Sequence, residues 1–317
     1  MSILEKLQTV IILFAIGIGL MLGQFAFFEN NAESFIIPFL LLMLYGLFLT
    51  IPLTQLKNAF KNIRFLSANT IMNFIWTPLF AWGLGAIFLA EHPALWVGFI
   101  MLMVTPCTDW YLVFTSIAKG NLSLSTSVLP INLILQVLLL PVYLFIFAGT
   151  LQSVSLSTII ESVVFVLFIP FSLAQLTRFI LRNKVTLLKE RVLPFFSSAQ
   201  IFFLSLAITA MFASQGSYLT NNLEIIYILI TPILLYFIIN FLLAKIAGKI
   251  LKFSYEDTVS LNLTTIARNS PVALAIAVTA FPDQPLIALA LVIGPLIELP
   301  VLAVVSQLLL NTRKKGL

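Results

Sequence analysis

The sequence predicts an all-α polytopic membrane protein with ten transmembrane helices, arranged as two inverted five-helix repeats. Hydrophobic residues make up 61% of the chain and charged residues 9%, with a mean hydropathy of +1.10. A soluble domain carries about 25% charged residues. The apolar residues form runs near the ~20 residues that a membrane-spanning helix needs. Ten such runs use nearly all of the 317 residues, so we expect no sizeable extramembrane domain.

Short polar connections separate the apolar runs and define the expected spans. These cover residues 7–28, 35–53, 65–90, 95–118, 124–147, 159–180, 192–213, 225–246, 259–281 and 286–310. The first run could be taken for a signal peptide, but it has the length of a span and no convincing small-residue cleavage site. The single cysteine, Cys107, excludes a disulfide framework within the chain and a multi-cysteine metal site.

The distribution of cations predicts the orientation of these spans. Sixteen of the 17 Lys and Arg residues lie on one side of a ten-span alternation, whereas the opposite connections contain acidic residues and no cation. Because cytoplasmic loops collect Lys and Arg, we expect both termini to be cytoplasmic and the protein to lie in the cell (inner or plasma) membrane. The basic composition therefore reflects membrane orientation and does not indicate nucleic acid as a partner.

Three charged residues fall in the middle of apolar runs: Asp109, Arg268 and Glu298. A charge at membrane depth costs a few kcal/mol or more, and it is retained where it is paired or faces a polar pathway. Asp109 and Arg268 are predicted to form an ion pair, which either fixes a helix crossing or is opened by a substrate or a proton. Burial disfavours the charged form of a carboxyl group. Glu298 is therefore the predicted proton carrier, with a structural hydrogen-bonding role as the alternative.

The fourth and ninth spans each contain a central proline, Pro106 and Pro271, between small polar residues. Proline removes a helix hydrogen bond, and broken helices at matching positions of two halves indicate a transporter binding site. Residues 107–110 align with residues 268–271, and Gln136 then falls close to Glu298. Since five spans per half is an odd number, the second repeat must be inverted. We expect the repeats to cover residues 1–152 and 153–317.

The motifs around these breaks resemble the bile acid:sodium symporter superfamily over essentially the whole chain, and its arsenite exporter branch most closely. Cys107 is followed by VFTSIAKGN at residues 113–121, Glu298 lies in GPLIELPVL, and ALAIA occupies residues 273–277. The triplet from Arg268 to Ser270 is similar to the Gln-Asn-Ser of the sodium-coupled branch. Thr264 stands where that branch has an acidic cation ligand, and a fixed Arg268 guanidinium carries the positive charge that a sodium ion would bring.

The resemblance implies a core of spans 3–5 and 8–10 beside a panel of spans 1, 2, 6 and 7. It also implies efflux of arsenite or antimonite in exchange for protons, with sodium as the other coupling ion considered. A cysteine thiolate is a soft ligand suited to trivalent arsenic, although a lone buried cysteine is often only a small apolar residue. The predicted substrate-binding residues are Cys107, Thr108, Asp109, Arg268, Asn269, Ser270 and Glu298.

A second set of residues is expected to line the cavity or a cation site. These are Asn73, Asn132, Gln136 and Thr264, and the predicted helix breaks are Pro106, Pro271 and Pro295. Interhelical hydrogen bonds are the alternative role for the amides.

Several function classes compete with metalloid efflux. A sodium- or proton-coupled organic anion symporter, with Arg268 receiving the carboxylate, is the alternative transporter. A channel is disfavoured because the buried charges are asymmetric. An intramembrane enzyme lacks a nucleophile–base pair. The chain contains no phosphate-binding loop, so ATP cannot drive transport directly. We expect no cofactor, a small-molecule or metalloid substrate, and the bilayer as the partner.

Overall fold

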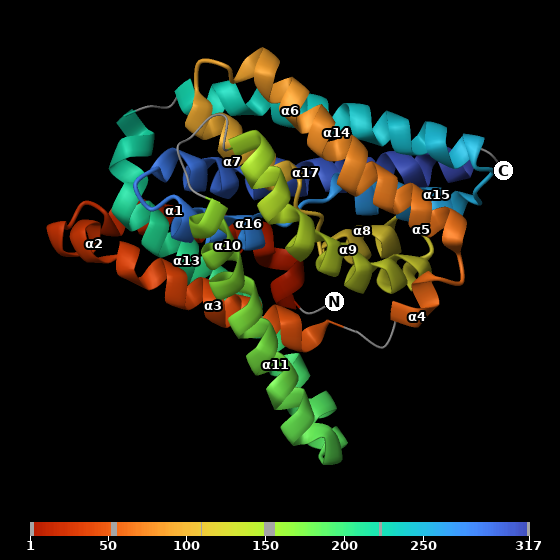
Figure 1. Cartoon of the computed structure of the whole chain (residues 1–317), viewed down its shortest axis with the longest axis horizontal. Coiled ribbons are helices and arrows are strands. Elements are labelled where there is room, and N and C mark those ends of the chain that lie inside the picture. The colour runs from red at the N-terminus through yellow and green to blue at the C-terminus, as the bar shows by residue number, and fades with distance from the viewer. Residues whose placement is uncertain (1–2, 52–55, 109, 149–155, 222–223, 316–317) are drawn as a thin grey trace. The chain divides into compact units, whose positions relative to one another are not determined.

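The computed structural model describes residues 3–51, 56–108, 110–148, 156–221 and 224–315 (Figure 1). These residues form helices and no β-strand, apart from one isolated bridge. Seven helices are long and apolar enough to cross a membrane, and three shorter apolar helices lie in the predicted spans 1, 4 and 9. The chain is therefore an all-helical, multi-pass membrane protein, as predicted. The count of ten spans and the inverted repeat remain predictions.

The helices follow the chain in a simple order. They are α1 (Ile3–Leu22), α2 (Ala26–Asn31), α3 (Glu33–Thr50), α4 (Leu56–Ala59), α5 (Ile63–Ile71), α6 (Thr77–Phe88), α7 (Pro93–Met103), α8 (Trp110–Ile117), α9 (Leu122–Tyr143), α10 (Leu156–Val163), α11 (Ile169–Ile180), α12 (Val185–Leu187), α13 (Leu193–Asn221), α14 (Glu224–Ile250), α15 (Tyr255–Ile266), α16 (Ser270–Ala280) and α17 (Pro285–Lys315). Two boundaries differ from the prediction: α1 ends before residue 28, and α13 continues past residue 213.

Wider, π-helical turns join several of these helices without ending them. Three of them, Met72–Trp76, Val164–Phe168 and Leu188–Val192, each stop two residues before a proline. Proline cannot donate to the carbonyl four residues earlier. At Pro78 that carbonyl belongs to Phe74, and the hydroxyl of Tyr143 on α9 donates to it at 2.6 Å. A neighbouring helix thus supplies the donor that the proline lacks, as a segment in lipid requires.

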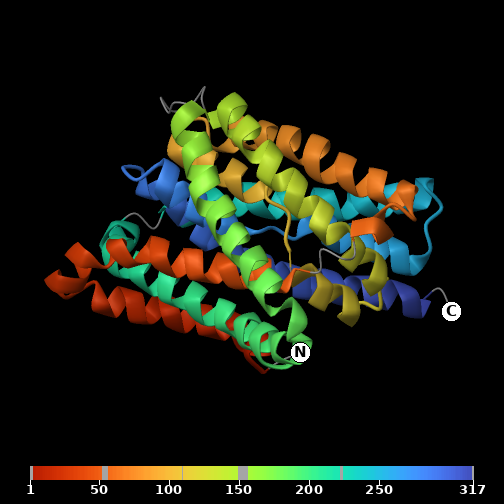
Figure 2. The ribbon, with the colours of Figure 1, turned by 60° about the horizontal axis from the view of Figure 1, so that its bottom comes forward.

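The chain contacts divide into two compact units, of which the first comprises Met1–Ile51, Ser157–Ile225 and Leu274–Pro285. In this unit α13 packs against α1 and α3, and α11 packs against α3 (Figure 2). Gly19 and Gly23 allow α1 to approach α13 closely. A Cβ on Gly19 would lie 2.6 Å from the Phe212 Cβ, and one on Gly23 would lie 2.7 Å from the Ala213 carbonyl oxygen. Small residues permit such contacts between membrane helices.

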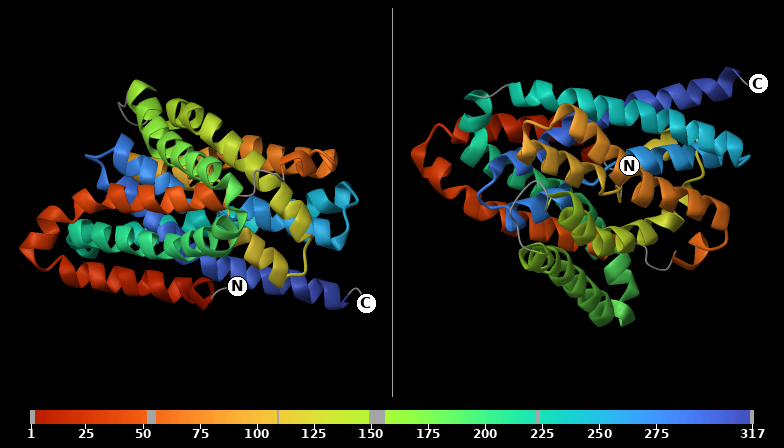
Figure 3. Two further views of the ribbon diagram at one scale, coloured as in Figure 1. Left: turned by 90° about the horizontal axis from the view of Figure 1, so that it is seen from below. Right: turned by 45° about the horizontal axis from the view of Figure 1, so that its top comes forward.

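The second unit comprises Pro52–Leu156, Ile226–Ala273 and Leu286–Leu317. It contains α5 to α9, α14, α15 and most of α17 (Figure 3). Here α7 and α17 pack closely at two glycines. A Cβ on Gly98 would lie 2.7 Å from the Ala290 Cβ, and one on Gly294 would lie 2.6 Å from the Leu102 Cδ2. This packing holds α17, which carries Glu298, against the helix that leads to Cys107.

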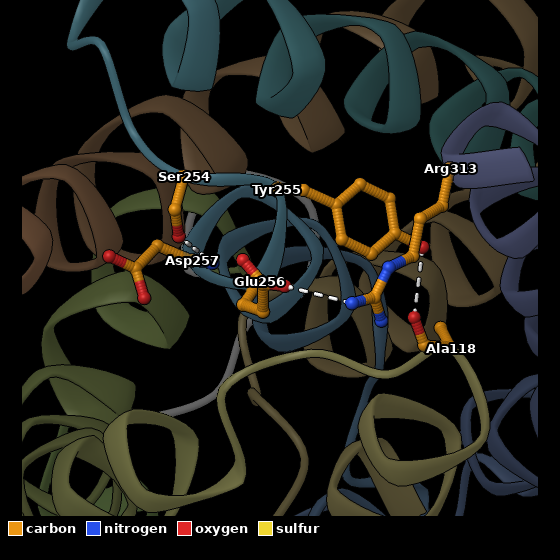
Figure 4. Close-up of polar contacts among 6 residues, drawn as sticks. All are labelled: Ala118, Ser254, Tyr255, Glu256, Asp257 and Arg313. Carbon is orange, nitrogen blue, oxygen red and sulfur yellow. Dashed lines mark hydrogen bonds and ion pairs between the residues drawn. The ribbon is translucent and has the colours of Figure 1, made fainter. Parts of the chain in front are cut away.

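Polar contacts at the start of α15 join it to α17 and to the connection between α8 and α9 (Figure 4). The Ser254 hydroxyl caps α15 by accepting from the Asp257 N–H at 3.1 Å, and the Tyr255 hydroxyl donates to the Ala118 carbonyl at 2.9 Å. Arg313 and Glu256 form an ion pair of 3.4 Å, with both side chains 43% exposed. An exposed pair of this kind contributes about 0–1 kcal/mol, so the buried cap and carbonyl contacts fix this end of the unit.

Candidate functional site

Two helix interruptions meet in the second unit and pair through their backbones. One lies between α7 and α8, and the other lies between α15 and α16. Pro106 and Arg268 form an isolated antiparallel bridge. The Cys107 N–H donates to the Ala267 carbonyl at 3.0 Å, and the Asn269 N–H donates to the Thr105 carbonyl at 2.7 Å. Each interrupted segment therefore satisfies backbone groups of the other in a buried place where water is not at hand.

Local sequence explains why α7 ends where it does. Pro106 has no N–H for the Leu102 carbonyl, and the Thr105 hydroxyl lies within hydrogen-bonding distance of that oxygen at 3.0 Å and of the Met101 oxygen at 2.9 Å. The next carbonyl, that of Met103, accepts from the Arg268 Nη1 at 2.7 Å. The terminal carbonyls of α7 are thus capped by one hydroxyl and one guanidinium.

The Arg268 side chain is 2% exposed and caps two helices at once. Besides Met103, it donates through Nε to the Ile266 carbonyl at 3.3 Å and through Nη2 to the Thr265 carbonyl. These oxygens end α15, and a helix C-terminus carries partial negative charge. Nη2 also donates to the Asn73 Oδ1 at 2.8 Å. The guanidinium therefore neutralises the ends of α7 and α15.

The predicted partner of Arg268, Asp109, lies outside the described residues, so the ion pair remains a prediction. The structure adds a contact that the sequence did not indicate: the guanidinium lies 5.5 Å from the centroid of the Tyr236 ring. Tyr236 is buried on α14, and its hydroxyl lies 3.2 Å from the Thr77 hydroxyl. A cation over an aromatic face is stabilised electrostatically.

Glu298 lies directly against the second interruption. Its side chain is 3% exposed, and its Oε1 accepts from the Arg268 backbone N–H at 2.8 Å. That donor is available because residue 268 lies outside the helices. The site therefore brings together the Cys107 segment, the Arg268 segment and an acidic side chain from α17.

The predicted helix break at Pro295 is wrong, because α17 runs through Pro295 and Pro300 without interruption. Pro295 leaves the Leu291 carbonyl without its helix donor, and the Ser270 hydroxyl donates to that oxygen. Ser270, predicted as a substrate ligand, thus performs a structural task. Pro271 lies in the first turn of α16, where a missing N–H costs nothing.

The remaining predicted substrate residues lie around the crossing. Asn269 accepts from the Val272 N–H at 3.3 Å, which caps α16, and its Nδ2 donates to the Thr108 hydroxyl at 3.2 Å. Cys107 and Thr108 are both buried. The structure therefore collects Cys107, Thr108, Asn269, Ser270, Arg268 and Glu298 in one region.

A chain of amides leads away from Arg268. Asn73 Nδ2 donates to Asn69 Oδ1 at 3.1 Å, and Asn69 Nδ2 donates to Asn132 Oδ1 at 2.6 Å. Thr264 contributes its carbonyl to Asn73 at 3.4 Å, while its hydroxyl bonds back to its own helix. Sequence reasoning missed Asn69. Its position four residues before Asn73, hence on the same helix face, was the available signal.

Three sequence relatives have informative printed names. The arsenical-resistance protein Acr3 of Corynebacterium glutamicum is 26% identical over 95% of this chain and 87% of its own length. The Acr3 protein of Alkaliphilus metalliredigens is 24% identical over 86% of this chain and 80% of its own. The uncharacterized sodium-dependent transporter YocS of Bacillus subtilis is 25% identical over 78% and 75%. The family model of the Sodium Bile acid symporter family matches residues 37–222, more than half of the chain. The chain therefore belongs to the Sodium Bile acid symporter family of transporters.

Proposed function

We propose that the protein is a secondary transporter that exports trivalent arsenic or antimony in exchange for protons. The observation that carries this proposal is the meeting of Cys107 and Glu298 at one backbone crossing. The Cys107 N–H bonds to the Ala267 carbonyl, and the next residue along, Arg268, donates its N–H to the Glu298 carboxyl group. Two relatives named for arsenical resistance support the choice of substrate.

In this proposal Cys107 and Glu298 have different tasks. The Cys107 thiolate binds the trivalent metalloid, because sulfur is a soft ligand. The Glu298 carboxyl group takes up a proton on one side of the membrane and releases it on the other. A proton on Glu298 changes the charge beside the Cys107 segment, so substrate and proton occupancy are linked at the crossing.

Arg268 makes sodium unnecessary as the coupling ion at this crossing. The carbonyl oxygens of Met103, Thr265 and Ile266 and the amide oxygen of Asn73 surround its guanidinium. Oxygen ligands of this kind also suit a hard cation, and a guanidinium is permanently charged. The side chain thus supplies from within the chain the positive charge that a sodium-coupled transporter takes from solution.

We further propose the architecture that goes with this activity. Ten spans form two inverted repeats, residues 1–152 and 153–317, and spans 3–5 and 8–10 form a core that moves relative to spans 1, 2, 6 and 7. Both termini face the cytoplasm in the cell membrane. The sixteen cations on one side of the predicted alternation support this orientation.

The experiment is a flux assay in everted membrane vesicles with an acidic lumen. Arsenite accumulates in wild-type vesicles, and the accumulation collapses with the pH gradient and is unchanged when choline replaces sodium. Cys107→Ser abolishes arsenite accumulation. Ser127→Ala is the matched control, because Ser127 is a buried residue of α9 that bonds only to the Leu124 carbonyl among the contacts described.

The alternative is symport of an organic anion. One observation favours it: the contacts described for the Arg268 guanidinium are to uncharged oxygens and an aromatic ring, so its charge is available to attract an anionic solute. The same vesicles distinguish the two functions. Sodium-driven uptake of taurocholate without arsenite flux establishes the alternative and rejects metalloid efflux.

A further inference from the structure

The charge on Arg268 fixes the direction of the buried amide chain. A guanidinium can only donate hydrogen bonds, so Asn73 must turn its Oδ1 toward Arg268 and its Nδ2 toward Asn69. Asn69 must then accept through Oδ1 and donate through Nδ2 to Asn132 Oδ1. Asn132 is left with its Nδ2 facing away from the chain. The far end of the chain is therefore a hydrogen-bond donor.

That donor is buried beside a second amide. Asn132 is 1% exposed and Gln136 is 0% exposed, and the two lie one turn apart on the same face of α9. Asn132 Nδ2, Gln136 Nε2 and Gln136 Oε1 have no hydrogen-bond partner among the described residues. An unpaired buried polar group typically costs about 1–3 kcal/mol. Three such atoms on one helix face are retained only for something that they bind.

We propose that Asn132 and Gln136 form a subsite for a hydroxyl group of a small uncharged solute. This inference rests on the proposed transport function and names the chemistry of its substrate. The hydroxyl oxygen accepts from Asn132 Nδ2, and its proton is donated to Gln136 Oε1. Halides and carboxylates have no proton to donate and leave Gln136 Oε1 unpaired. The subsite thus favours a protonated hydroxy acid or a polyol over its anion.

The test combines binding and stability in the purified protein. Gln136→Leu removes two unpaired buried atoms, so it raises the thermal unfolding midpoint while it weakens binding of arsenous acid, measured by equilibrium dialysis at pH 7, about tenfold. Asn132→Asp keeps the acceptor for Asn69, loses the outward donor, and weakens binding similarly. Ser127→Ala binds as the wild type does. Arsenate, an anion at this pH, does not compete.

Two results overturn the inference. One is wild-type binding by both Gln136→Leu and Asn132→Asp, which leaves water as the only occupant. The other is the failure of arsenous acid, boric acid and glycerol alike to bind the wild-type protein. Arsenite flux that persists unchanged in both variants rejects the subsite and leaves metalloid transport intact. Loss of boric acid or glycerol binding in Gln136→Leu, without arsenite flux in the wild type, retains the subsite and rejects that substrate.

Discussion

The Oε1 atom of Glu298 accepts a 2.8 Å hydrogen bond from the backbone N–H of Arg268, 30 residues earlier in the chain. The donor belongs to the interruption between α15 and α16, and the acceptor belongs to the uninterrupted α17. A change in the protonation of Glu298 therefore acts directly on the segment that pairs with Cys107.

Glu298→Gln is expected to fold and to lose proton coupling. The glutamine keeps an oxygen that accepts from the Arg268 N–H, but it cannot titrate. Arsenite counterflow between equal pH values persists, whereas accumulation against a gradient in acid-loaded vesicles disappears. Proton-driven accumulation at the wild-type rate in Glu298→Gln vesicles rejects Glu298 as the carrier and leaves Asp109 as the candidate.

Ser270→Ala is expected to destabilise the protein, and Pro295→Ala is expected to reverse the effect. The first change leaves the Leu291 carbonyl without a donor, at a cost of about 1–3 kcal/mol. The second restores an N–H four residues after Leu291, so the helix satisfies its own carbonyl. Thermal unfolding of the two single variants and the double variant in detergent measures the coupling. Additive effects of the two changes contradict the proposed compensation.

Arg268 and Asp109 are predicted to be coupled in folding. Arg268→Met leaves the carbonyls at the ends of α7 and α15 uncapped and leaves Asp109 uncompensated. Loss of one partner of a buried pair costs about 3–5 kcal/mol, so membrane expression falls sharply. Adding Asp109→Asn recovers part of the expression. Equal expression of the wild type, both single variants and the double variant contradicts the pair.

The orientation of the spans is testable by cysteine labelling in a Cys107→Ser background. Asn31→Cys and Gln215→Cys react with a membrane-impermeant maleimide added to intact cells. Lys61→Cys is the control on the cation-rich side and reacts only after permeabilisation. The expected pattern follows from the cation distribution. Labelling of Lys61→Cys, but not Asn31→Cys, in intact cells reverses the topology.

Local sequence indicated the interruption at Pro106 because proline acts on the turn that precedes it. The same reasoning failed at Pro295, since the compensating Ser270 hydroxyl comes from a segment 21 residues away. It also sought a charged partner for Arg268. The printed contacts are instead mainly backbone carbonyls, which every residue has and which no sequence pattern reveals. Asn69 and Tyr236 enter the site through tertiary contacts.

The bridge between the two interruptions is made by main-chain atoms of Thr105, Cys107, Ala267 and Asn269. Backbone N–H and C=O groups are present whatever side chain a residue carries. The crossing therefore tolerates substitution of the Cys107 and Thr108 side chains without losing the hydrogen bonds that hold it. A single frame of this kind can be refitted for solutes of different chemistry by exchanging a few side chains, which makes specificity a separable property of the fold.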